Sequence, residues 1–358
     1  MNENLTIELL KNLTSIRTVS SDYQACLNAL QLIANLLTRN KIPTRIINGN
    51  ESPVLISGKR SAKILLLGHI DVVSADEDDF ALLITEKTLH GRGVLDMKGP
   101  LSVMISTFIS LWNKGNSNLF LTITSDEEIG GFKGFKIIQK HLPKKIKICI
   151  LPDTNTDNII INQKAPLHIQ IECRGISAHA SRPWEGKNSS ELLIQCCTDL
   201  INEINDTDKE KTTATITQFN SGDSINVVPD RAAAIIDIRI HSKKELKIIL
   251  SKIKTITEKY TCLWKALDKP LFFEMDEKNS FISSWAEVGK QLANQTPQFQ
   301  TEAGTSDARF LQTLKIPTIV TGAIGGGAHS KNEWVSIESL VKFQQKLLTF
   351  CIKESEII

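Results

Sequence analysis

Short apolar runs separated by helical patterns constrain the fold of this chain more than any other feature. An uninterrupted apolar run of this length fits a strand that is buried on both faces of a sheet. Four such runs occur, at Lys63–Gly68, Leu119–Thr124, Ile146–Leu151 and Thr318–Thr321. Apolar residues at helical spacing occupy Gln24–Arg39, Pro100–Trp112, Phe132–Lys140, Ser280–Gln295 and the segment from Ile337 onward. Alternating strands and helices predict an α/β fold with a doubly wound, largely parallel sheet.

The middle of the chain follows a different pattern. Apolar and polar residues alternate at Leu167–Cys173, and two further strands are expected at Thr212–Phe219 and Ala232–Ile240. Helical patterns lie at Ser189–Ile204 and Lys243–Ile256. This order predicts a smaller α+β (ferredoxin-like) domain inserted into the α/β domain. We therefore expect one domain made of residues 1–164 and 277–358, and a second made of residues 165–276.

Composition and charge exclude several classes of protein. The 358 residues are 41% hydrophobic and 23% charged, with a net charge of +2, as in ordinary globular enzymes. Neither a basic stripe for nucleic acid nor a membrane anchor is evident. Met1–Leu10 lacks the features of a signal peptide, so we expect a cytoplasmic protein. The seven cysteines are scattered and form no CxxC pair, which favours free, buried thiols.

Polar side chains end or follow the apolar runs. His69 and Asp71 come at the end of the first run and share one face of an extended segment. Asp96 lies in a glycine-bracketed loop before a helix, and Glu127 and Glu128 follow the second run. Each feature alone has a structural explanation: a His–Asp hydrogen bond, a helix N-cap and a surface acidic pair.

The later runs end in the same way. Asp153 follows the third run, and His329 follows Gly325–Gly327 after the fourth. Open α/β sheets bind ligands at the carboxyl ends of their strands. Two histidines with several carboxylates suit a pair of zinc-like ions, which accept mixed nitrogen and oxygen ligands. The combination predicts a two-metal site with one carboxylate left free for proton transfer.

The ordered motifs resemble the co-catalytic zinc metallopeptidase and deacylase family. This family includes acetylornithine deacetylase, succinyl-diaminopimelate desuccinylase, aminoacylase, carboxypeptidase G and bacterial dipeptidases. The matching segments are Gly68–Val73, Gly91–Gly93, Asp96–Gly99, Asp126–Glu128, Gly175 with His179–Pro183, Asn226–Asp230, Asp237–Arg239, Gly304–Arg309 and His329.

The resemblance implies the ligands of two divalent metal ions. One ion would be held by His69, Asp96 and Asp153, and the other by Asp96, Glu128 and His329, with Asp96 bridging. Zinc is expected from its affinity for such donors, with cobalt or manganese as alternatives.

The same resemblance implies the catalytic groups. Glu127 would be the general base and Asp71 would orient His69. A water between the metal ions would lose a proton to Glu127, and the resulting hydroxide would attack the amide carbonyl. Glu127 would then return the proton to the leaving amine.

Residues of the inserted domain are implied to complete the site. His179 would stabilise the oxyanion, commonly across a homodimer interface, which makes the insert a lid or dimerisation domain. Asn226 and Arg239 would contact the substrate, and Thr305 and Arg309 would line the same pocket. A structural ion pair is the alternative for either arginine.

Two substrate classes stay open. The segment Gly304–Phe310 favours a cytoplasmic deacylase of amino-acid biosynthesis, which removes an acetyl or succinyl group from N-acetylornithine or N-succinyl-diaminopimelate. Asp153, where deacylases of the family usually carry glutamate, favours a dipeptidase or exopeptidase. An inactive binding protein is disfavoured because Glu127 and every ligand position are present. A dinucleotide enzyme is disfavoured because Gly325–Gly327 lacks the strand-to-helix fingerprint.

Overall fold

The chain forms two compact units. The computed structural model describes residues 3–49, 51–205, 211–293 and 296–357. The first unit comprises Met1–Ile161, Met275–Gln300 and Ser306–Ile358, and the second comprises Asn162–Glu274 with Thr301–Thr305. The larger segment of the second unit is therefore an insertion in the sequence of the first, and the short segment Thr301–Thr305 joins it.

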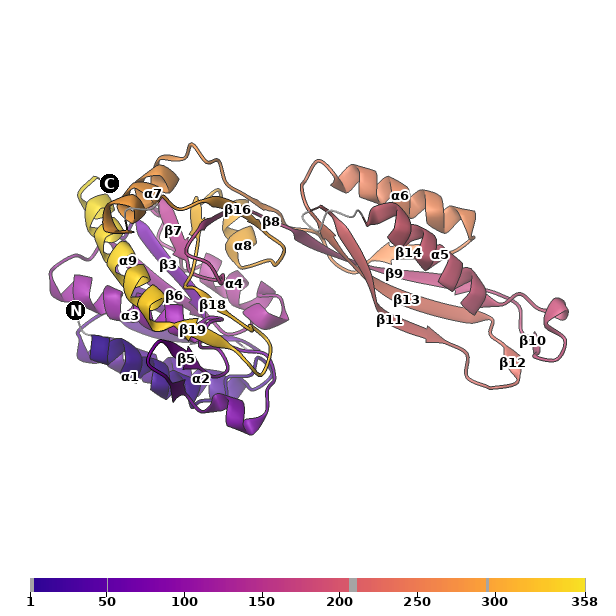
Figure 1. Ribbon diagram of the computed structural model, residues 1–358, viewed down its shortest axis with the longest axis horizontal. Coiled ribbons are helices and arrows are strands. Elements are labelled where there is room, and N and C mark those ends of the chain that lie inside the picture. Colours follow the sequence, from indigo (N-terminus) through magenta and orange to yellow (C-terminus); the bar gives the residue numbers. More distant parts are fainter. Residues whose placement is uncertain (1–2, 50, 206–210, 294–295, 358) are drawn as a thin grey trace. The chain divides into compact units, whose positions relative to one another are not determined.

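A mixed sheet with parallel inner strands forms the centre of the first unit (Figure 1). The inner strands β6, β3, β7 and β17 are parallel, whereas β1, β2 and β8 pair antiparallel at the margins. In sheet order the strands are β1 (Thr44–Asn48), β2 (Pro53–Gly58), β6 (Leu119–Thr124), β3 (Ile64–His69), β7 (Ile148–Leu151), β17 (Thr318–Val320), β8 (Ile159–Gln163) and β15 (Phe273–Glu274), with β16 (Phe299–Glu302) also on β8. The predicted α/β class is confirmed, and the antiparallel margins are an addition to it.

Helices cover both faces of this sheet. Figure 1 shows α3 and α9 on one side, and α4 and α8 on the other. The helices are α1 (Glu3–Thr14), α2 (Tyr23–Arg39), α3 (Lys98–Asn113), α4 (Phe132–Gln139), α7 (Ser280–Ala293), α8 (Ala308–Thr313) and α9 (Ile337–Ile357). Helix α3 is buried almost all round, and Pro100 lies in its first turn, where its missing N–H leaves no bond unmade. Across the described residues, every helix is too short or too polar to span a bilayer.

A small four-stranded sheet joins segments that are far apart in sequence. Its order is β18 (Gly325–Gly326), β19 (Trp334–Ser336), β5 (Thr88–His90) and β4 (Leu83–Ile84). The pairing of β19 with β5 brings the loop after β5 close to the loop before β19. The sequence patterns did not predict this sheet, because its strands have only two or three residues each.

The second unit has the predicted ferredoxin-like order. Its elements are β9 (Ala165–Arg174), α5 (Ser189–Ile204), β11 (Thr213–Ser221), β13 (Arg231–Ile240), α6 (Leu246–Lys259) and β14 (Leu263–Ala266). The antiparallel sheet has the order β11-β13-β9-β14. Residues of β9 and β13 alternate between buried and partly exposed, so one face packs on the helices. Beyond β9 lie β10 (Ala178–His179), the 3₁₀ turn Pro183–Glu185 and β12 (Val227–Val228).

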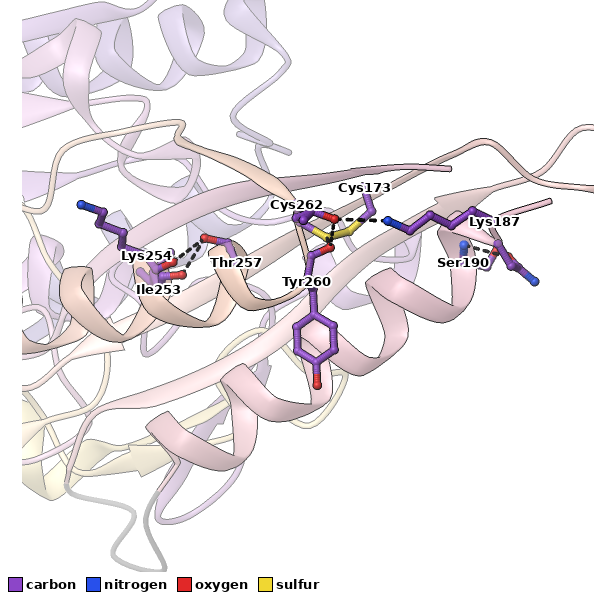
Figure 2. The surroundings of a disulfide bond; sticks show 10 residues. Cys173, Lys187, Ser190, Ile253, Lys254, Thr257, Tyr260 and Cys262 are labelled. Carbon is purple, nitrogen blue, oxygen red and sulfur yellow. Dashed lines mark hydrogen bonds between the residues drawn. A yellow bond between two sulfur atoms is a disulfide. The ribbon is translucent and has the colours of Figure 1, made fainter. Parts of the chain in front are cut away.

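Two cysteines of the second unit form a disulfide, so the prediction of free thiols is wrong for this pair. Cys173 and Cys262 are bonded across 89 residues of sequence (Figure 2). Glu172 of β9 pairs with Leu263 of β14, which places the neighbouring cysteines 4.5 Å apart at Cα. The other five cysteines are free and buried. Scattered spacing in sequence did not reveal a contact that only sheet pairing creates.

Candidate metal centre

The candidate metal ligands come from neighbouring strand ends of the first unit. His69 is the last residue of β3 and pairs with Thr124 at the end of β6. Glu128 lies in the short 3₁₀ helix η2 (Glu127–Ile129) that follows β6, and Asp153 lies just beyond β7. Because parallel strands end at one edge of the sheet, these segments lie together.

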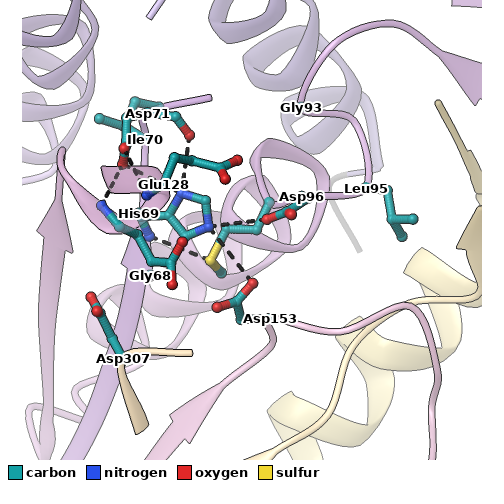
Figure 3. A network of polar contacts seen from close by, with 12 residues as sticks. Gly68, His69, Ile70, Asp71, Gly93, Leu95, Asp96, Glu128, Asp153 and Asp307 are labelled. Atoms are coloured by element: carbon teal, nitrogen blue, oxygen red, sulfur yellow. Dashed lines mark hydrogen bonds and ion pairs between the residues drawn. The ribbon is translucent and has the colours of Figure 1, made fainter. Parts of the chain in front are cut away.

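Two groups of side chains that share Asp96 have the geometry of metal ligands. The first is His69, Asp96 and Asp153, and the second is Asp96, Glu128 and His329; ligand atoms within each group lie within 4.8 Å of one another. Oδ1 of Asp96 lies 3.1 Å from Nε2 of His69, and its Oδ2 lies 3.2 Å from Nε2 of His329. Figure 3 shows the first group around the His69 ring. Imidazole and carboxylate donors with one shared carboxylate fit a pair of zinc-like ions.

The electrostatics of the cluster also fit divalent cations. Burial raises the pKa of Glu128 and of Asp153, and the nearby charge of Asp96 adds to both shifts. Hydrogen bonds to Asp96 and Glu128 raise the pKa of His329 to about 10. In the metal-free protein, protonated imidazole therefore balances the carboxylates. A divalent ion would displace those protons and supply the positive charge instead.

Asp71 connects the His69 ring to the η2 segment. Nδ1 of His69 lies 3.0 Å from the backbone oxygen of Asp71 and 3.5 Å from its Oδ1. The buried carboxylate also accepts hydrogen bonds from the amides of Glu127 and Glu128 and from the hydroxyl of Ser20. Asp71 thus fixes a ligand ring and the loop beside it. Ser20 was not among the residues selected from sequence, because no motif surrounds it.

Glu127 stands apart from both ligand groups. Among the described residues its carboxylate accepts no hydrogen bond, and it belongs to neither group. Burial raises the pKa of Glu127 well above its usual value, and the negative charge of Asp153 adds to the shift. A carboxyl group without a fixed partner and with a raised pKa can accept and release a proton.

The segment after Gly304 contributes a buried arginine and a buried aspartate. Nη2 of Arg309 donates to the Gly130 oxygen at 2.7 Å, and the guanidinium lies over the Phe310 ring at 4.8 Å from its centroid. These contacts fix the end of η2.

Asp307 lies beside the metal centre (Figure 3). Its Oδ1 has no partner in the described part of the chain, and burial raises the pKa of this carboxyl group to about 7. Sequence reasoning did not select Asp307, although it lies in the same motif.

The remaining predicted site residues belong to the second unit. His179 is exposed in β10, where it pairs with Val227, and its Nδ1 lies 2.8 Å from the Ser181 hydroxyl. The backbone oxygen of Asn226 accepts a hydrogen bond from the amide of Ala180. His179 and Asn226 therefore lie together at one end of this unit.

Arg239 lies at the opposite end of the same sheet. It pairs with Pro166 at the start of β9, and its Nε and Nη2 each donate to the Asp237 carboxylate at 2.9 Å. Strand β13 separates it from the His179 end by roughly 25 Å at 3.3 Å per residue. Thr305 donates to the backbone oxygen of Lys164. Within the second unit, the structure does not bring Arg239 to His179 and Asn226.

Comparison with known proteins identifies the family. The chain is similar to a succinyl-diaminopimelate desuccinylase from Ruthia magnifica subsp. Calyptogena magnifica, at 26% identity over 365 residues that cover 94% of this chain and 96% of that protein. A tripeptidase from Staphylococcus aureus has the same fold, with a TM-score of 0.82 and 16% identity over 99% of both chains. So does an M20 metallo-carboxypeptidase from Sulfolobus solfataricus, with a TM-score of 0.80 and 18% identity over 99% of both chains. The family model described as peptidase family M20/M25/M40 matches residues 65–353, so the chain belongs to that family.

Proposed function

We propose that this protein is a two-metal amidohydrolase that removes an acetyl or succinyl group from an N-acyl amino acid. N-acetylornithine and N-succinyl-diaminopimelate are the proposed substrates, and amino-acid biosynthesis in the cytoplasm is the proposed setting. The observation that carries the proposal is the pair of ligand groups sharing Asp96, with Glu127 outside both. Similarity to a succinyl-diaminopimelate desuccinylase over most of the chain supports the acylated amino acid as substrate class.

The ligand groups define the proposed metal sites. His69, Asp96 and Asp153 would hold one divalent ion, and Asp96, Glu128 and His329 the other. Zinc is the expected metal, with cobalt or manganese as alternatives. When bound, such ions lower the pKa of water and polarise a carbonyl group.

Glu127 is the proposed general base and, later, the general acid. Its carboxylate takes the proton of the attacking water and delivers it to the leaving amine nitrogen. The hydrogen bond from the Glu127 amide to Asp71 fixes the backbone of this residue, while its carboxylate has no hydrogen-bond partner in the described part of the chain. Asp71 also orients the ring of His69 in this proposal.

His179 and Asn226 are proposed to act on substrate bound by the partner subunit of a homodimer. A histidine at this position would stabilise the oxyanion, and an asparagine would contact the substrate. Both lie at an exposed end of the second unit, near Trp184, whose surface is 75% exposed. A large exposed apolar side chain beside polar catalytic groups suits insertion into another subunit.

Strand β11 offers the proposed dimer contact. It is the edge strand of the second unit, and Ile216 and Phe219 on it are exposed, as is Ile194 on the adjacent α5. An open edge with apolar neighbours favours pairing with a second copy. Arg239, Thr305 and Arg309 are proposed to contact the substrate or fix the pocket wall.

A dipeptidase or exopeptidase is the second candidate. Asp153 in place of glutamate favours it, and peptidases have the same fold as this chain. Both candidates use the same metal ions and the same Glu127, and they differ in the products that they release.

The test is a hydrolysis screen with purified protein loaded with zinc or cobalt. The panel contains N-acetylornithine, N-acetylcitrulline, N-succinyl-diaminopimelate and a set of dipeptides, each with a chelator control. Chelator-sensitive release of acetate or succinate is the expected result. Cleavage of dipeptides alone would replace the deacylase with the peptidase, and no hydrolysis of any substrate would contradict both.

A further inference from the structure

Glu333 is a buried carboxylate that accepts four hydrogen bonds. It lies just before β19, and only 2% of its surface is exposed. Its Oε2 accepts from Nη1 of Arg92 at 2.8 Å and from the amide of Gly93 at 2.9 Å. Its Oε1 accepts from the amides of Leu95 at 2.9 Å and Asp96 at 3.2 Å. Both oxygens therefore have two donors each.

These bonds hold the loop that carries Asp96. The loop lies between β5 and α3, so no ladder of a strand or helix holds its amides. Gly93 has φ +81°, and a Cβ there would lie 2.7 Å from Cγ1 of Val72, so the backbone is confined at this point. The Asp96 carboxylate belongs to the same residue whose backbone amide donates a hydrogen bond to Glu333. Its position thus depends on Glu333 more than on regular secondary structure.

The same contacts connect this loop to the segment that carries His329. Nη2 of Arg92 donates to the backbone oxygen of Ser330 at 3.1 Å. The amide of Gly91 donates to the backbone oxygen of Glu333 at 3.2 Å. Both Asp96 and His329 therefore sit on segments joined through one buried ion pair, Arg92–Glu333, at 2.8 Å.

We infer that Glu333 is a positioning residue that sets the geometry of the two-metal centre through the backbone of the Asp96 loop. The inference rests on the proposed function, because it takes Asp96 to be the ligand shared by both ions. Glutamine cannot replace the carboxylate, because its amide group would turn two hydrogens toward two N–H donors. Aspartate keeps the charge and both acceptor oxygens but is shorter by one methylene.

The test compares Glu333→Gln and Glu333→Asp with the wild type and with a control, Glu338→Gln, at an exposed position in the first turn of α9. Zinc affinity is measured by competition with a chelator, and the absorption spectrum of the cobalt-loaded protein reports ligand geometry. We expect Glu333→Gln to bind zinc about 10- to 100-fold more weakly, as for other groups that orient metal ligands. The zinc affinity of Glu333→Asp should lie between those of Glu333→Gln and the wild type, and the zinc affinity of the control should equal that of the wild type. Once the hydrolysis screen has identified a substrate, kcat of Glu333→Gln should fall by a larger factor than its KM rises.

Wild-type zinc affinity and an unchanged cobalt spectrum in Glu333→Gln would overturn the inference. If that variant does not fold, as judged by circular dichroism of the metal-free protein, the Glu333→Asp variant decides by the same two readouts. Failure of the two-metal assignment on which the inference rests is distinguishable, because the wild type itself would then bind no pair of ions. A wrong substrate class would show only in the hydrolysis screen and would leave the zinc affinities unchanged.

Discussion

At the scale of single residues, Glu127 and Glu128 are adjacent in sequence and differ in environment. Oε2 of Glu128 lies 3.0 Å from Nε2 of His329, whereas Glu127 has no such partner among the described residues. Both amides donate to the Asp71 carboxylate, which fixes the backbone of η2 at these two residues. A metal ligand and a proton carrier can therefore occupy consecutive positions.

Replacing Glu127 by glutamine should abolish turnover and leave metal binding intact. The amide has the same shape but accepts no proton, so we expect kcat to fall by at least about 10²–10⁴-fold. Metal analysis should still give two ions per chain. Glu338→Gln is the matched control, because Glu338 is exposed and paired with Lys342. Substantial activity in Glu127→Gln would remove this residue from the proposed mechanism.

Metal binding should release protons, because the pKa of His329 is raised to about 10 in the metal-free protein. Below that pH the ring is protonated, and a metal ion binds only the neutral imidazole. Zinc affinity should therefore increase with pH until this proton is lost and decrease as the pH falls. Calorimetry in buffers of different ionisation enthalpy counts the protons released. His329→Ala should release fewer protons and bind one ion instead of two; an unchanged proton count would contradict the assignment.

At the scale of elements, a disulfide fastens β9 to the segment before β14. The bond joins Cys173 to Cys262, which face each other because the two strands are paired. Disulfides are unusual in reducing compartments, so the state of this pair also bears on the proposed cytoplasmic setting.

Thiol titration of the denatured protein should give five thiols before reduction and seven after it. Replacing both cysteines by alanine should lower the free energy of unfolding by about 2–5 kcal/mol, because a long closed loop is opened in the unfolded chain. Chemical denaturation of the oxidised and reduced wild type gives the matched comparison. Seven thiols before reduction would show that the pair is reduced in the protein as isolated and that the disulfide contributes nothing to its stability.

At the scale of the whole molecule, the predicted catalytic residues are divided between two units. The candidate metal ligands belong to the first unit, and His179 and Asn226 belong to the second. Arg239 lies at the other end of the second unit's sheet from these two residues. In the proposed homodimer, His179 of one subunit would act on the metal centre of its partner.

Mixed dimers test this arrangement. A dimer of one Glu127→Gln subunit and one His179→Ala subunit contains one metal centre with Glu127 intact. If His179 acts on the partner's site, that centre receives an intact histidine, and the mixed dimer should regain about half of wild-type activity. The two homodimers, each inactive or nearly so, are the controls. Differently tagged subunits allow the mixed dimer to be isolated.

Mixed dimers that stay inactive would place His179 in the site of its own subunit. A protein that is monomeric by light scattering at assay concentration, and active, would contradict the proposed role of the dimer altogether.

Local sequence patterns are sufficient to predict the fold class and the kinds of residue at the strand ends. Periodicity predicts β3, β6 and β7 because each is a run of residues buried on both faces. It also predicts β9 and β13, whose alternation matches a sheet with one covered face. These features depend on neighbours along the chain, and local sequence therefore suffices for them.

Contacts between groups that are distant in sequence follow from the tertiary fold and could not be predicted from local patterns. Asp96 lies 3.2 Å from His329 across 233 residues, and Arg92 lies 2.8 Å from Glu333 across 241. The short pairing of β19 with β5 creates these contacts, and neither strand is long enough to leave a pattern. The disulfide and the buried positions of Asp307 and Arg309 likewise arise from packing. Periodicity reports which face of an element is buried, whereas the partner on that face depends on how the whole chain folds.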